Sequence, residues 1–149
     1  MLFVLFYVAA FVALTAAVLV VTCLNAAHAL MHLIVSLLAV AVMLHVLGAS
    51  FAAALQVIVY AGAIVVLFVF VVMMLNLGKD SVGREQSWLA PGAWLVPGGL
   101  AAILLGELLW LLLAADGITA GRSVSPGAVG RLLYGPWILV VELAAVLLL

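Results

Sequence analysis

Five long apolar runs constrain this chain more than any other feature of its sequence. Each contains roughly 20 residues or more, and about 20 is the length that an α-helix needs to cross a hydrocarbon core of about 30 Å at 1.5 Å per residue. The sequence therefore predicts an all-α membrane protein with five transmembrane helices, in a single polytopic domain over residues 1–149. We expect these helices at about Leu2–Thr22, Ala29–Leu47, Phe51–Leu77, Trp94–Ala115 and Val129–Leu149.

Composition and charge narrow the possible partners. Hydrophobic residues make up 72% of the chain and charged residues 6%, far from the balance of a soluble domain. A net charge of −1 provides neither a basic face for nucleic acid nor a polybasic segment for anionic lipid headgroups. Nucleic acid is therefore excluded as a partner, and the lipid bilayer is the expected surrounding. The lone Cys23 predicts neither an internal disulfide nor a metal site, and is interpreted as a small apolar residue.

The first and last apolar runs differ from the three between them. No basic residue precedes the first run, which is too long for a signal-peptide core, so it is expected to be a transmembrane helix. The last run contains Gly135-Pro136, and the segment from Pro136 to Leu149 rises only roughly 21 Å. Either the span starts near Val129 and kinks at the proline, or the chain is a shortened form here.

Two carboxyl groups lie deep inside apolar runs, Glu107 and Glu142. A charge at the centre of a membrane helix costs about 2.5–3.5 kcal/mol or more, so each is a candidate for proton handling. The alternative is a carboxyl kept neutral, or paired by a neighbouring chain, for packing. Glu107 is expected to face a partner subunit. Because no lysine or aspartate lies at mid-membrane, the chain alone cannot form a continuous proton path.

The three histidines of the chain are candidate axial ligands of haem. His28 and His32 share one helical face, and His45 follows at a spacing that suits a second haem. Axial ligation of both haem faces needs matching histidines on another helix, and the sequence has none. Haem binding by this chain alone is therefore excluded. We favour the alternative in which each histidine makes a hydrogen bond near a membrane interface.

The third run combines a hydroxyl with a flexible joint in Tyr60-Ala61-Gly62-Ala63. One interpretation is packing, in which small residues let another helix approach and the tyrosine hydroxyl bonds to it. The other is a π-bulge, which frees a carbonyl and often marks a functional site. The run rises about 40 Å, more than the core needs, but Gln56 and Asn76 at the two interfaces also account for that length.

Four segments together resemble one family. They are "NAAHAL" at Asn25–Leu30, "VIVYAGAIVVLFVFVVMMLNL" at Val57–Leu77, "EQSWLAP" at Glu85–Pro91 and "LYGPWILVVELA" at Leu133–Ala144. In this order they closely resemble the subunit J family of bacterial proton-pumping NADH:quinone oxidoreductase, respiratory complex I. The mitochondrial counterpart is chain 6 of NADH dehydrogenase.

The resemblance implies a multi-pass subunit of the cell inner (cytoplasmic) membrane, between the quinone-reducing junction and the pump modules. Its partners would be other membrane subunits of complex I. It would be non-catalytic and would bind no cofactor or metal itself, whereas the whole complex uses NADH, flavin, iron–sulfur clusters and quinone. Its expected function is to help couple quinone reduction to proton translocation.

The resemblance also implies roles for individual residues. A π-bulge lies close to the tyrosine that matches Tyr60, which would relay a hydrogen bond beside a water-filled proton path. Glu142 matches an acidic position of some relatives, and Glu107 matches none. Rotation of a hinge would open or close the path; its residues are Ala61, Gly62, Ala63, Ile64, Val65, Val66, Leu67 and Phe68. The alternatives are a purely structural bundle that joins neighbouring subunits, and a small haem-binding or transport protein acting alone.

Overall fold

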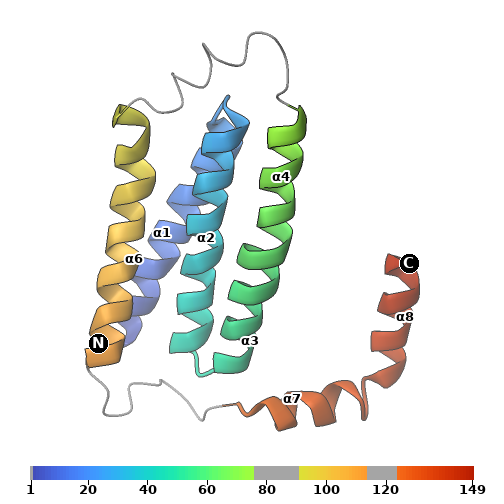
Figure 1. Ribbon diagram of the computed structural model, residues 1–149. Helices are drawn as coiled ribbons and strands as arrows, with labels where there is room; N and C mark the ends of the chain where they lie inside the picture. The colour runs from blue at the N-terminus through green and yellow to red at the C-terminus, as the bar shows by residue number, and fades with distance from the viewer. Residues whose placement is uncertain (1, 76–90, 114–123) are drawn as a thin grey trace.

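The computed structural model describes residues 2–75, 91–113 and 124–149, and the regular structure in these ranges is entirely helical (Figure 1). This confirms the all-α membrane prediction. The elements are α1 (Leu2–Thr22), α2 (Ala26–Val46), α3 (Ser50–Leu55), the π-helix η1 (Gln56–Ile64), α4 (Val65–Leu75), the 3-10 turn η2 (Pro91–Trp94), α6 (Leu95–Leu113), α7 (Pro126–Leu133) and α8 (Ile138–Leu148).

Within the described residues, four spans are long and apolar enough to cross a membrane: α1, α2, α6 and the continuous helix Ser50–Leu75. This last span joins α3, η1 and α4 and is called helix three below. Figure 1 shows the four spans side by side, with α7 and α8 beyond helix three. Some residues named in the sequence analysis lie outside the described ranges, namely Asn76, Leu77, Ala115 and most of Glu85–Pro91.

The core lies between α1, α2 and α6. Ala13, Ala16 and Ala39 are buried there, and such small side chains let helix backbones approach closely in a bilayer. The Ser36 hydroxyl donates to the backbone oxygen of Ala13 at 3.1 Å, which joins α1 to α2. The other core residues are Val12, Val35, Leu100 and Leu104.

The start and end of α2 follow from its flanking residues. Asn25 has an extended backbone, and its side-chain oxygen accepts from the Ala27 N–H at 3.0 Å. This cap starts the helix at Ala26, earlier than the expected Ala29. At the other end Gly48 has a φ of 86°, which favours glycine, and the chain turns tightly into helix three.

The predicted fifth helix is a bent pair. Ser125 caps α7 by accepting from the Ala128 N–H, and α8 follows after a break at residues 134–137, with an angle of 82° between the two. Pro136 in the break has no N–H to continue a helix. A Cβ at Gly135 would lie 2.5 Å from the Arg131 backbone oxygen, so the break also needs a glycine. The kink expected at Gly135-Pro136 is therefore a sharp bend.

Candidate gating segment in helix three

The backbone of helix three changes its hydrogen-bond register over Gln56–Ile64. At its first residue, the Gln56 N–H still donates to the carbonyls of Ala52 and Ala53, as in an α-helix or a 3-10 turn. After it, the Val65 N–H donates to the carbonyls of Tyr60 and Gly62 and skips Ala61, the acceptor that an α-helix would use. The expectation of a π-bulge in the third span is thus confirmed, in the form of a π-helix. At 9 residues it exceeds the usual single-turn bulge.

Gly62 suits the π register for a specific steric reason. A Cβ built on Gly62 would lie 3.2 Å from the Val57 backbone oxygen, tighter than ordinary van der Waals contact. Residue 57 is five positions before residue 62, which is the spacing of the π-helical hydrogen bond. The absence of a side chain at Gly62 therefore relieves crowding that belongs to the π register.

Every residue of the segment is at least partly exposed outside its own chain. No residue of Gln56–Ile64 is buried, and Tyr60 is 51% exposed. Among the described residues, the structure gives the Tyr60 hydroxyl no hydrogen-bond partner. Directly after the segment, Val65 is 1% exposed and fixes the start of α4 against the bundle. The π-helix is therefore an outward-facing segment between two anchored ends, because Ala53 in α3 is also buried.

The expected hinge residues fall into two groups. Ala61, Gly62, Ala63 and Ile64 lie in the π-helix with Tyr60, whereas Val65, Val66, Leu67 and Phe68 lie in the first turn of α4. The π-helix also begins earlier than the expected hinge, at Gln56.

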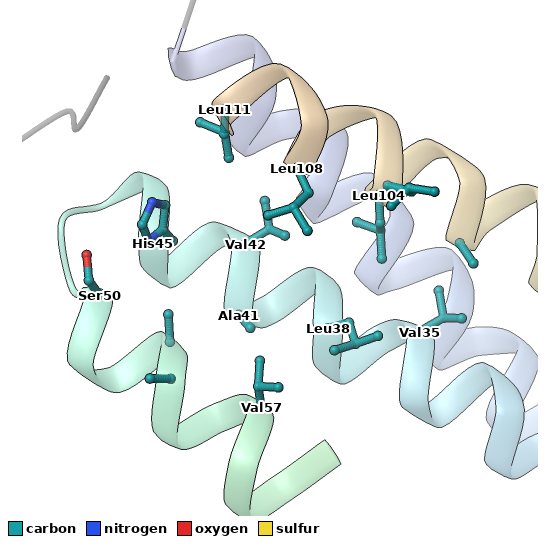
Figure 2. Close-up of a pocket in the computed structure, with 14 residues that line it drawn as sticks. Val35, Leu38, Ala41, Val42, His45, Ser50, Val57, Leu104, Leu108 and Leu111 are labelled. Carbon is teal, nitrogen blue, oxygen red and sulfur yellow. The ribbon is translucent and has the colours of Figure 1, made fainter. Parts of the chain in front are cut away.

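A cavity of about 450 Å³ lies beside the start of this segment, between α2, α3 and α6. Figure 2 shows His45 and Ser50 at one end of it, and Val35 and Leu104 toward the other. Val57, in the first turn of the π-helix, contributes to its wall. The remaining lining residues are apolar: Leu38, Ala41, Val42, Ala53, Ala54, Ala101, Leu105, Leu108 and Leu111.

Glu107 lies inside the bundle. It is 6% exposed, and it continues the buried face of α6 formed by Leu100 and Leu104. Neither carboxyl oxygen has a hydrogen-bond partner in the described part of the chain. The expectation that Glu107 faces a partner subunit is therefore wrong, because the residue points toward its own core. A buried carboxyl without a cation is less costly as the neutral acid than as the carboxylate.

Glu142 has the opposite environment. It lies on α8, where every residue is exposed except the half-buried Val141. In Figure 1, α8 stands apart from the bundle that contains Glu107 and from α4. Tyr60, Glu107 and Glu142 thus occupy three different places, on the surface of helix three, in the core and on α8. The structure does not bring them together.

The histidines have separate local roles. The Nδ1 atom of His32 lies 2.8 Å from the His28 backbone oxygen, while its Nε2 is buried without a partner among the described residues. His45 is exposed and lines the cavity. The described ranges contain no group of three or more side chains that could hold a metal ion. Sequence reasoning missed the role of Ser36, whose only signal was a hydroxyl in an apolar helix.

Comparison with known proteins identifies the family. The model for NADH-ubiquinone/plastoquinone oxidoreductase chain 6 matches residues 16–149. The chain is 56% identical to NADH-quinone oxidoreductase subunit J of Pseudomonas aeruginosa, over 97% of this chain and 88% of that protein. It is 49% identical to subunit J of Escherichia coli, over 97% and 79% of the two chains. Identity to subunit 10 of Thermus thermophilus is 42%, over 95% and 80%.

These matches cover nearly the whole chain, including helix three and the bent pair. The chain belongs to the NADH-ubiquinone/plastoquinone oxidoreductase chain 6 family, and it is a membrane subunit of NADH-quinone oxidoreductase, complex I.

Proposed function

We propose that helix three is a gating element that helps couple quinone reduction to proton translocation in complex I. The observation that carries this proposal is the continuous π-helix Gln56–Ile64 within an otherwise α-helical membrane span. The chain itself would supply no catalytic group. NADH, flavin, iron–sulfur clusters and quinone would be held by other subunits, and the chain would lie in the bacterial inner membrane among its membrane partners.

The gating step is a change of hydrogen-bond register. In the π form the Val65 N–H donates to the Tyr60 carbonyl, and in an α form it would donate to Ala61 instead. A shift by one residue turns α4 by about 100° relative to α3, because an α-helix has 3.6 residues per turn. Such a rotation would move the side chains of Val66, Leu67 and Phe68 from one neighbouring surface to another and open or close a water path.

Rotation of a packed helix needs free volume, because protein interiors are close-packed. The cavity beside Val57 provides such volume at the end of helix three where the π-helix begins. Its apolar lining lets aliphatic side chains enter without leaving polar groups unpaired. The other side of helix three is exposed along η1 and α4. On that side, only neighbouring subunits and lipid would restrict its rotation.

Proton transfer would use polar groups at separate places along the route. Tyr60 would relay a hydrogen bond at the surface of helix three, and Glu107 and Glu142 would each accept and release a proton in an apolar environment. Because these three lie apart, groups of other subunits and ordered waters would have to connect them. This agrees with a subunit that opens a path and does not form all of it.

A second function is supported by the exposure of helix three. Few residues of this span are buried inside the chain, so many of its apolar side chains are available for contact with other subunits. In a purely structural role, Tyr60 and the small residues after it would only join neighbouring helices. Under the gating function, a mutation in helix three would change the turnover of the assembled complex. Under the structural function, it would change the amount of assembled complex.

The test uses inner-membrane vesicles that contain the whole complex with Tyr60→Phe or Gly62→Val. NADH oxidation and proton uptake are measured and divided by the amount of assembled complex. The gating function predicts fewer protons per NADH in both variants at unchanged amounts of complex. Normal pumping by a reduced amount of complex would support the structural function instead, and wild-type values for both quantities in both variants would exclude a gating role for this segment.

A further inference from the structure

Glu142 is an exposed carboxyl on a helix that is apolar on every side. The other residues of α8 are Ile, Leu, Val and Ala. A helix that is apolar all round is normally buried on all sides, in lipid or against other helices. The carboxyl of Glu142 is therefore the one side chain on α8 that can bond to a polar group. A protein partner can offer such a group, and lipid tails cannot.

The depth of Glu142 follows from its neighbours. Tyr134 and Trp137 are 74% and 57% exposed and lie in the bend before α8, as aromatic residues do at a membrane–water interface. Glu142 follows Trp137 by five residues, which is about 7 Å along a helix. With these aromatics at the interface, the carboxyl would lie about one and a half turns deeper, within the apolar helix α8.

The described part of this chain offers Glu142 no counter-charge. Arg131 is its only arginine or lysine, and it lies on α7, beyond the 82° bend. No ion pair or hydrogen bond joins Arg131 to Glu142 in the structure. An ionisable side chain within a membrane segment is almost always paired, and it usually faces protein or a water-filled cavity. A partner for Glu142 therefore has to come from outside the described residues.

We propose that α8 docks through Glu142 onto a transmembrane helix of another complex I subunit that carries a lysine or arginine at the same depth. That cation would lie at the depth of Glu142, about one and a half turns below the level of Tyr134 and Trp137. In a low-dielectric setting, the pair would fix both the depth and the rotation of α8. This inference does not depend on gating by helix three, and it assigns to Glu142 the pairing with a neighbouring chain that is the alternative to proton transfer.

The first test maps the partner by photo-crosslinking in membranes that contain the whole complex. A photoreactive phenylalanine analogue replaces Leu139 or Val146, which share a helical face with Glu142, and Val140 on the opposite face serves as the control. We expect adducts from Leu139 and Val146 to one other subunit, within a turn or two of an intramembrane lysine or arginine. Adducts to lipid alone, to this chain, or to a segment without a basic residue would overturn the proposal.

The second test changes the charge on assembled complex. Glu142→Gln keeps the volume of the side chain and is expected to lower the crosslink yield several-fold. Glu142→Lys is expected to abolish the crosslink, and changing the mapped basic residue to glutamate in the same complex should restore it. Leu143→Met serves as a control for packing on α8 and should leave the yield unchanged. Unchanged yields with both Gln and Lys, at wild-type amounts of complex, would refute charge pairing.

Discussion

Replacing Gly62 by alanine tests the π register with the smallest possible change. The new Cβ would lie 3.2 Å from the Val57 oxygen, so the backbone must give by a few tenths of an ångström. A backbone adjustment of this kind, a bond-angle change of about 7°, costs about 1 kcal/mol. In the α register residue 62 bonds to residue 58, so the crowding with Val57 is relieved. Alanine therefore favours the α form by about 1 kcal/mol, a factor of about five in the ratio of the two forms.

If both forms are needed in each catalytic cycle, this bias lowers coupled turnover by up to about fivefold. The assay measures the rate of proton uptake and the rate of NADH oxidation separately in sealed vesicles, each normalised to assembled complex. Gly98→Ala is the matched control, because a Cβ on Gly98 in α6 meets nothing within 4 Å. The steric argument fails if Gly62→Ala pumps as well as Gly98→Ala and a map shows its π-helix intact.

Further expected outcomes concern three other residues. Tyr60→Phe removes only a hydroxyl from a half-exposed ring, so we expect normal assembly on native gels with reduced proton uptake. Glu107→Gln keeps a neutral polar group in the core, so the amount of complex should stay unchanged while pumping falls; unchanged pumping would exclude a proton-handling role. Gly135→Ala places a Cβ 2.5 Å from the Arg131 oxygen and should destabilise the bend by about 1–3 kcal/mol, measured as loss of the subunit on heating, whereas Gly130→Ala has open space and should not.

The sequence was sufficient to predict the all-helical class and the first four of the five expected spans, because the bilayer constrains both. The length of a hydrocarbon crossing and the need to pair every backbone group allow only helices in such runs. The expected bounds of the first run, Leu2–Thr22, coincide with those of α1. The second helix starts earlier than expected because the Asn25 side chain caps it, and hydropathy does not register a cap.

The detailed arrangement could not be predicted for two physical reasons. A π-helix and an α-helix use the same side chains and differ only in which carbonyl each N–H selects, so the start at Gln56 was not apparent from the residues. The direction of Glu107 depends on which face of α6 meets α1 and α2. Because α6 is apolar on almost every side, its sequence has no polar stripe that would orient it.

The most direct test of gating is a map of the whole complex in lipid, recorded during NADH turnover at a resolution that distinguishes α from π registers. Gating predicts two classes of particles: one in which the Val65 N–H meets the Tyr60 carbonyl, as here, and one in which it meets Ala61 with α4 rotated. A π-helix over Gln56–Ile64 in every class of an actively pumping complex would contradict it.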